Sequence, residues 1–279
     1  MDTSERLLTR NFSVQRVERG AAERLTDTVA VEEPLAIRLE YWTKDRRVAD
    51  SLAVTMRTPG QDRELAAGFL VSEGIVRQKR EIVHVRSIGT EPSNEIVLEL
   101  AHGVDVETWR TERAAFVSAG CGICGKRSRE AVSGEIPPPQ MDALRVDRSL
   151  IEKLPALLEA RQQGFASTGG LHAAALLTQD GCVERVFEDI GRHNALDKLI
   201  GWCLLNDDLP LRDALLFLSS RSSFELVQKC AMAGARVLAT VGGPSSLAIE
   251  AAREYGVTLI GFVRTSRFNV YSGEWRINL

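Results

Sequence analysis

The spacing of apolar side chains along the first hundred residues is mostly that of β-strands. Leu35, Ile37, Leu39 and Tyr41 alternate with more polar neighbours, which is typical of a strand with one buried face. Similar apolar patterns predict three further strands in this half of the chain. They cover residues 48–56, 82–88 and 95–100.

Two other segments of this half differ from that pattern. Residues 1–30 are polar and charged, and we expect a loosely attached arm or an edge strand there. Residues 62–73 carry apolar side chains at helical spacing, with acidic residues in the first turn and Gly74 just past the end. These are the start and stop signals of a helix.

A run of three prolines divides the chain. Pro137, Pro138 and Pro139 cannot continue a helix or a central strand. They predict a boundary between a smaller, mainly β N-terminal domain, residues 1–135, and a second domain, residues 140–279.

Helices and strands alternate in the second domain. Apolar strands separated by helices of ordinary length imply a sheet covered on both faces, with parallel crossovers. The predicted fold class is therefore α/β, or α+β when both halves are counted. The predicted strands are 171–178, 183–187, 214–218, 236–241 and 257–263, and the predicted helices are 150–163, 194–205, 224–233 and 245–255.

Composition then narrows the class of protein. The 279 residues carry a formal net charge of −3 and no long block of Lys or Arg, so we expect neither a nucleic-acid nor a membrane-surface partner. No apolar run approaches the length of a membrane span, and the charged N-terminus lacks the apolar core of a signal peptide. Five cysteines, an odd number, indicate the reduced thiols of a cytoplasmic protein and not a disulfide scaffold.

The most informative chemistry lies at residues 120–125, which read Gly-Cys-Gly-Ile-Cys-Gly. Glycines allow the backbone to bend and to approach a partner closely. Basic residues follow at once, and nearby cations lower the pKa of a thiol and raise its thiolate fraction. Cys121 and Cys124 therefore look like sulfur atoms offered by a glycine-hinged loop.

Four interpretations of this pair stay open on the residues alone. A structural zinc site usually needs four ligands, and the chain holds no second pair of this kind. A thioredoxin-like redox pair normally opens a helix directly after a strand, whereas these surroundings are richer in glycine than a helix start prefers. A persulfide relay would use a thiolate that accepts a sulfur atom and passes that outer atom on by thiol exchange. The fourth interpretation is an inert surface pair.

Five segments, taken in their order and spacing, resemble the formate dehydrogenase accessory sulfurtransferase family, known as FdhD. The first surrounds the cysteine pair, and the others follow downstream. The resemblance extends from about residue 30 to the C-terminus. The segments are 116–126, 168–174, 188–198 (Glu-Asp-Ile-Gly-Arg-His-Asn-Ala-Leu-Asp-Lys), 219–225, and 261–264 leading to 268–271.

The resemblance implies a sulfurtransferase, a sulfur carrier that formate dehydrogenase requires. Sulfur would come from a cysteine desulfurase as a persulfide on Cys121, with Cys124 assisting. The acceptor would be the molybdenum or tungsten bis(molybdopterin guanine dinucleotide) cofactor, before its insertion into formate dehydrogenase. The resemblance further implies a homodimer. Two alternatives remain: a chaperone that binds the molybdenum cofactor without chemistry, and a thiol–disulfide oxidoreductase.

The resemblance also implies a three-layer α/β/α fold like that of cytidine deaminases for residues 140–279. Zinc deaminases need a His-x-Glu motif and a later Pro-Cys-x-x-Cys. Here His193 is followed by Ala195 where the glutamate should stand, and residues 220–223 contain no thiol. We therefore expect neither a deaminase nor a tightly bound metal.

Diphosphates bind to backbone N–H groups at helix starts and to basic side chains. Two expected helix starts fit this chemistry, at residues 219–222 and 242–245, and ordinary serine capping is the alternative at each. His172 is expected in the core. By the resemblance, the cofactor-binding residues are Phe262, Val263, Arg264, Thr265, Ser266 and Arg267, with His193 near the same face.

Overall fold

The computed structural model describes residues 8–44, 46–89, 93–106, 136 and 143–279. The predicted loop that carries Cys121 and Cys124 lies outside the described residues. So does most of the predicted boundary between residues 135 and 140. The division into two domains at that point stays a prediction.

The N-terminal half forms a four-stranded sheet in the order β4-β3-β6-β5. One face is apolar and packs on helix α2 (Asp62–Ser72), whereas the other face carries charged side chains that pair across strands. All four strands and the helix agree with the apolar pattern of the sequence. The strands are β3 (Glu33–Trp42), β4 (Arg47–Arg57), β5 (Ile82–Ser87) and β6 (Glu95–Leu100), and a 3-10 turn, η1 (Lys79–Glu81), precedes β5.

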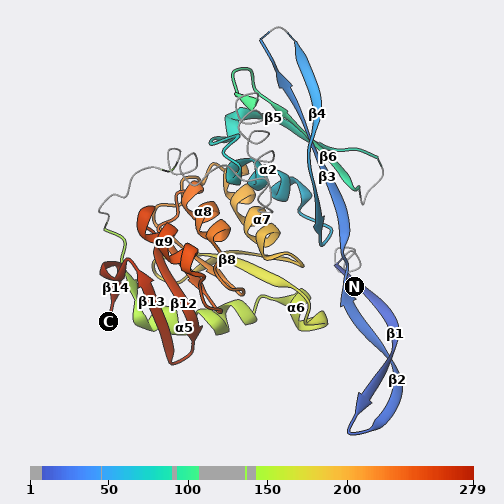
Figure 1. Ribbon diagram of the computed structural model, residues 1–279, viewed down its shortest axis with the longest axis vertical. Coiled ribbons are helices and arrows are strands. Elements are labelled where there is room, and N and C mark those ends of the chain that lie inside the picture. Colours follow the sequence, from blue (N-terminus) through green and yellow to red (C-terminus); the bar gives the residue numbers. More distant parts are fainter. Residues whose placement is uncertain (1–7, 45, 90–92, 107–135, 137–142) are drawn as a thin grey trace.

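The polar N-terminal segment forms an antiparallel hairpin of strands β1 (Thr9–Glu18) and β2 (Ala21–Ala30). Its two strands make a sheet of their own. Figure 1 shows the hairpin projecting away from the rest of the molecule. The structure thus has an arm, and not an edge strand of a larger sheet, at this position.

The C-terminal half is built on a six-stranded sheet in the order β13-β12-β11-β10-β8-β9. Only β10, β11 and β12 are mutually parallel, so the expectation of parallel crossovers holds for the centre of the sheet alone. Antiparallel pairs flank this centre because short turns join β8 to β9 and β12 to β13. The strands are β8 (His172–Thr178), β9 (Val183–Asp189), β10 (Ala214–Leu218), β11 (Val237–Thr240), β12 (Thr258–Arg264) and β13 (Arg267–Ser272).

Helices cover both faces of this sheet, which confirms the three-layer α/β/α class (Figure 1). Helices α7 (Arg192–Leu205), α8 (Phe224–Met232) and α9 (Ser246–Glu254) lie on one face. Helix α5 (Arg148–Glu159) packs on the other face through a separate apolar cluster. A single helix over 150–163 is wrong, because α5 ends at Glu159 and a short helix, α6 (Gln163–Thr168), begins separately. A small pair of strands, β7 (Val146–Asp147) and β14 (Ile277–Asn278), and a 3-10 turn, η2 (Glu274–Arg276), complete the structure.

The two halves share one hydrophobic core. Helices α2 and α7 cross with their backbones in contact at two glycines, Gly68 and Gly201. A Cβ on Gly68 would lie 1.8 Å from the carbonyl oxygen of Asp197, and a Cβ on Gly201 would lie 1.8 Å from that of Glu64. No helix in the described part of the chain is long and apolar enough to cross a membrane.

Candidate functional site

A cationic pocket of about 280 Å³ lies at the edge of the sheet where the parallel strands β10, β11 and β12 end. Ligands of open α/β sheets commonly bind beyond the carboxyl ends of parallel strands. The pocket brings together three arginines, one histidine and two serines, and no acidic side chain occurs among the described residues that line it. The lining residues are His172, Arg192, Ser219, Ser220, Arg221, Val241, Gly242 and Arg264.

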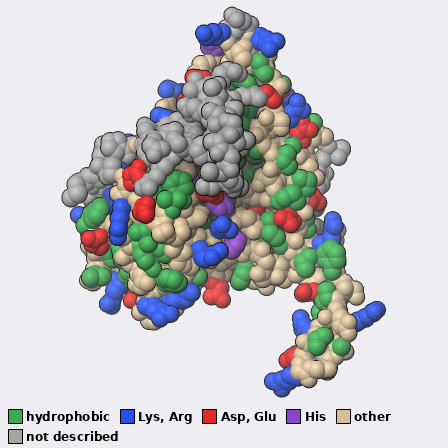
Figure 2. Space-filling model, viewed as in Figure 1, with side chains coloured by type: hydrophobic (Ala, Val, Ile, Leu, Met, Phe, Trp, Pro, Cys, Tyr) green, Lys and Arg blue, Asp and Glu red, His purple; other side chains and the backbone are tan. Residues whose placement is uncertain are grey.

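Figure 2 shows histidine and basic side chains gathered near the middle of one face of the molecule. The protein as a whole carries a net charge of −3. The described residues that line the pocket are therefore positively charged, although the protein as a whole is negatively charged. Such a cluster favours anions, and the planar guanidinium group suits the paired oxygens of phosphate.

Backbone hydrogen bonds hold the loops after β10 and β11 together. The N–H of Gly242 donates to the carbonyl of Ser220 (2.9 Å), and the N–H of Ser222 donates to the carbonyl of Gly243 (3.3 Å). Gly242 cannot be replaced without movement, because a Cβ there would lie 2.6 Å from Cγ of Arg221. The two segments that the sequence singled out, 219–222 and 242–245, thus meet in one wall of the site.

The segment from Phe262 to Arg267 forms the end of β12, a tight turn and the start of β13. Phe262 has a φ of 52° and its ring covers Gly243, where a Cβ would lie only 2.5 Å from the ring. A positive φ is strained for a bulky residue, and it leaves the ring 44% exposed beside the pocket wall. Arg264 lines the pocket and is anchored by donation to the carbonyl of Val241 (2.7 Å).

The rest of this predicted binding segment is placed differently. Val263 is fully buried in the cluster under α5. Thr265 and Ser266 form the exposed turn, and Arg267 is exposed on β13. None of these four residues lines the cationic pocket.

His172 was expected in the core, and that expectation is wrong. It is half-buried at the start of β8, and its Nδ1 lies 3.5 Å from Oγ of Ser219. Burial, together with the nearby Arg192, lowers the pKa of His172 below its ordinary value of 6.5, although Asp189 acts in the opposite direction. The imidazole is therefore neutral at pH 7 and available as a hydrogen-bond partner.

This lowered pKa predicts a pH-dependent loss of stability. Below pH 6.5 the histidine of the unfolded chain is protonated, while the folded protein keeps it neutral to lower pH. The unfolded state then binds more protons, so the free energy of unfolding falls as the pH falls through this window. We expect urea denaturation to show that the free energy of unfolding decreases less between pH 7.5 and pH 5.5 for His172→Gln than for the parent protein. A His172→Gln protein that keeps the parent's full loss of stability between these pH values would contradict the assignment.

Two neighbouring side chains at the start of α7, those of Arg192 and His193, have different surroundings. Arg192 lines the pocket. Nε2 of His193 lies 3.3 Å from a carboxylate oxygen of Glu225 on α8. His193 is thus next to the pocket along the chain, but it does not line it.

Asp189 and Lys198 of segment 188–198 hold the two halves of the molecule together. Asp189 and Lys198 form an ion pair of 2.8 Å in which both side chains are fully buried. The carboxylate of Asp189 also accepts from the N–H of Thr58 (3.2 Å) and of Gly191 (2.9 Å), and Lys198 donates to the carbonyl of Thr58 (3.0 Å). This network fixes the start of α7, and with it Arg192, against the N-terminal half.

A second buried ion pair joins helices α7 and α8. Nζ of Lys229 on α8 lies 2.6 Å from a carboxylate oxygen of Asp197 on α7. The hydroxyl of Ser72 on α2 donates to the same carboxylate (2.6 Å). The sequence singled out Asp197 as part of segment 188–198, but only its burial shows that its contacts, with Lys229 and Ser72, are internal.

The described cysteines differ in their capacity for thiol chemistry. Burial raises the pKa of Cys203 and of Cys230 to about 12, which leaves almost no thiolate at neutral pH. Cys182 is exposed. No group of three or more metal-ligating side chains occurs among the residues that the structure describes.

Comparison with known proteins gives a consistent set of similarities. Residues 30–278 match the FdhD/NarQ family. The sulfur carrier protein FdhD of Streptomyces coelicolor is 45% identical over 98% of this chain and 96% of its own length. The sulfur carrier protein FdhD of Mycobacterium tuberculosis is 42% identical over 90% of this chain and 92% of its own.

A similarity of fold extends to a solved structure. The crystal structure of a candidate formate dehydrogenase accessory protein from Desulfotalea psychrophila superimposes with a TM-score of 0.75. It covers 97% of this chain and 100% of that chain, at 23% sequence identity. The likeness supports the architecture described above.

Proposed function

The chain belongs to the FdhD/NarQ family, and from this premise we propose that it is a sulfurtransferase, a sulfur carrier in the maturation of formate dehydrogenase. The proposal rests on one observation above all. The chain places two thiols in a glycine-rich, basic segment at Cys121 and Cys124, whereas two of its other cysteines have thiols that burial renders unreactive.

The proposed chemistry is one persulfide exchange followed by release of the outer sulfur to the substrate. The thiolate of Cys121 attacks the outer sulfur of a persulfide on a cysteine desulfurase, so that a new sulfur–sulfur bond forms and the desulfurase thiolate leaves. The thiolate of Cys124 then attacks the Cys121 sulfur, the bond to the outer sulfur breaks, and a Cys121–Cys124 disulfide forms. The outer sulfur leaves as sulfide, reduced by the two electrons that the cysteine sulfurs give up, and is taken up by the substrate, the molybdenum or tungsten bis(molybdopterin guanine dinucleotide). A thiol reductant then returns both cysteines to thiols. The sulfurated substrate is inserted into formate dehydrogenase, and we propose that both steps take place in the cytoplasm on a homodimer.

The cationic pocket is the proposed place for a guanine dinucleotide arm of that substrate. A diphosphate carries charges that Arg192, Arg221 and Arg264 can neutralise, and the exposed ring of Phe262 is a surface on which a base can stack. Val263, Thr265, Ser266, Arg267 and His193, also implied by the resemblance, would act around this pocket and not within it.

Replacing Cys121 tests the chemistry directly. After incubation with a cysteine desulfurase and cysteine, mass spectrometry of the parent is expected to show one added sulfur atom on the peptide that contains residue 121. Cys121→Ser is expected to abolish both this addition and the activation of formate dehydrogenase, because no other side chain type can hold the transferred sulfur. Cys182→Ser, at an exposed cysteine away from the pair, is the control and should keep both. A Cys121→Ser protein that still activates the dehydrogenase would indicate a chaperone without chemistry.

Replacing single arginines tests the binding site. Arg264→Ala is expected to weaken the binding of GDP by about tenfold, because a charged hydrogen bond in a pocket contributes roughly 1.5 kcal/mol or more. Arg148→Ala, at an exposed arginine on α5 outside the pocket lining, is the matched control and should change the affinity by less than about twofold. Isothermal titration calorimetry measures both. Equal losses would show that the cationic pocket does not hold the nucleotide.

A further inference from the structure

A second depression lies at the opposite edge of the C-terminal sheet. We call it the helix-end groove; it has a volume of about 460 Å³ and is lined from segments 71–79, 204–212 and 232–236. Helices α2, α7 and α8 all end at its border. Because the cationic pocket lies where β10 and β11 end and this groove lies where they begin, the two sites are separate.

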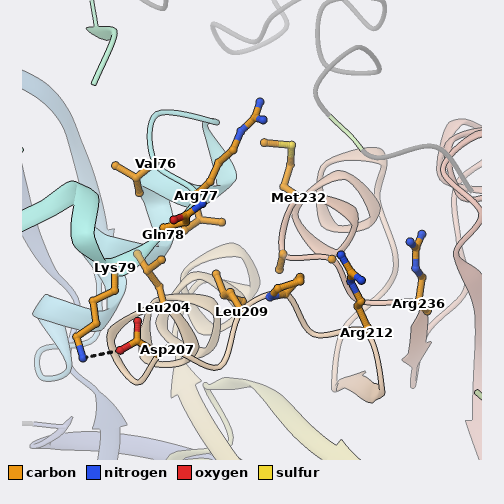
Figure 3. Close-up of a pocket in the computed structure, with 14 residues that line it drawn as sticks. Val76, Arg77, Gln78, Lys79, Leu204, Asp207, Leu209, Arg212, Met232 and Arg236 are labelled. Carbon is orange, nitrogen blue, oxygen red and sulfur yellow. Dashed lines mark hydrogen bonds and ion pairs between the residues drawn. The ribbon is translucent and has the colours of Figure 1, made fainter. Parts of the chain in front are cut away.

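The floor of the groove is apolar and held in place by backbone hydrogen bonds. Leu204, Leu209 and Met232 line it, and Val76 lines it from the N-terminal half (Figure 3). The N–H of Leu211 donates to the carbonyl of Ala233 (2.9 Å), which joins two of the three lining segments. The groove is therefore formed before any ligand arrives.

The rim of the groove is basic. It carries Arg77, Lys79, Arg212 and Arg236 against a single acid, Asp207, which pairs with Lys79 at 3.0 Å. The other three guanidinium groups form no ion pair within the described part of the chain. Among the described residues of a protein with a net charge of −3, three positive charges thus lie around one apolar floor without an ion-pair partner.

The arrangement of these charges favours an extended chain of carboxylates over a compact anion such as phosphate. Figure 3 shows Arg77 on one side of the groove and Arg212 and Arg236 on the other, with the apolar side chains between them. Separated cations fit carboxylates that are spaced along a chain better than they fit one compact phosphate. The carboxyl ends of three helices also border the groove; their partial negative charge opposes a compact polyanion, whereas their carbonyl groups can accept hydrogen bonds from peptide N–H groups.

We propose that the helix-end groove is a docking site for an acidic segment of a partner polypeptide. Carboxylates of that segment pair with Arg77, Arg212 and Arg236, and apolar side chains between them fill the floor at Leu209 and Met232. The partner would reach the protein without covering the cationic pocket. This inference does not depend on sulfur chemistry at Cys121.

Fluorescence anisotropy with the full chain tests the proposal, using a labelled peptide in which Glu alternates with Leu. The charge-reversed variant Arg77→Glu/Arg212→Glu, at two exposed positions, is expected to bind this peptide at least about tenfold more weakly than the parent. The control Arg16→Glu/Arg24→Glu changes the net charge equally on the remote hairpin and should stay within about twofold. Met232→Glu, which alters only the floor, is a second variant that should weaken binding as well.

Three results would overturn the proposal. The first is no binding of the peptide to the parent at about 1 mM, a weak limit for any specific site. The second is an equal loss in the rim and hairpin variants, or equal binding of a matched peptide with Gln in place of Glu. The third is complete displacement of the peptide by an equal concentration of inorganic pyrophosphate, which would make the groove a small-anion site.

Discussion

Replacing Gly68 by alanine is expected to lower the free energy of unfolding by about 3 kcal/mol, at the upper end of what overpacked cores show. The added methyl group would lie 1.8 Å from the carbonyl oxygen of Asp197 and 2.8 Å from the backbone nitrogen of Gly201. Backbone atoms of a packed helix cannot turn aside as a side chain can, so α2 and α7 must separate. Separation opens the core that the two halves share. The helix propensity of alanine offsets only about 1 kcal/mol of this loss.

Thermal unfolding followed by circular dichroism measures the effect, which corresponds to a fall in Tm of about 10 °C for a chain of this size. Gly201→Ala should behave in the same way, since its Cβ would meet the carbonyl of Glu64. Gly170→Ala is the matched control, because a Cβ there meets its nearest atom at an ordinary 3.6 Å. Equal values of Tm for Gly68→Ala and Gly170→Ala would show that the two helices do not cross as described.

Removing the carboxylate of Asp189 is the second change with a large expected effect. Asp189→Ala leaves the ammonium group of Lys198 fully buried without its ion-pair partner, and such a change lowers stability by about 3–5 kcal/mol. It also removes the acceptor for the N–H groups of Thr58 and Gly191. The start of α7 then loses its attachment to the N-terminal half, so GDP binding through Arg192 should weaken together with stability.

Urea denaturation of three variants distinguishes the cost of an unpaired buried charge from the cost of lost packing. Glu152→Ala breaks the pair of Arg148 and Glu152 on α5, which is largely exposed at the arginine, and should lower stability by less than about 0.5 kcal/mol. Asp189→Asn/Lys198→Met removes both buried charges and should be more stable than Asp189→Ala. If the double variant is the less stable of the two, an unpaired buried charge is not the cause of the loss.

The apolar pattern of the sequence was sufficient to predict most elements. Strands with one buried face, such as β3, and fully buried strands, such as β10, stand within a residue or two of their predicted positions. The pattern failed where two elements lie close together: residues 150–163 were predicted as one helix but form α5 and α6, and β13 was not predicted. The spacing of apolar residues predicts which face of an element is buried, but it does not predict where one element ends and the next begins.

The sequence predicted the chemistry of the candidate site, but only some of the residues that line it. Arg264 and the segments 219–222 and 242–245 were singled out, and they meet in the cationic pocket. His172 was assigned to the core, because an isolated histidine in an apolar strand has no sequence signal that distinguishes a pocket wall from an interior. The conformation of Phe262, with its positive φ, depends on the flat surface that Gly243 provides from another loop.

The sequence by itself determined the strands and helices and the cysteine pair at residues 121 and 124, since each depends on residues that are near one another along the chain. It also determined the family, through the order and spacing of segments spread over most of the chain. Only the tertiary structure decided which polar residues face a ligand. Arg192 enters the pocket, whereas Asp189 and Lys198 of the same segment are buried against Thr58, more than a hundred residues earlier in the chain. That distinction arises from packing between distant segments, because a charged side chain becomes internal only when another part of the fold supplies its partner.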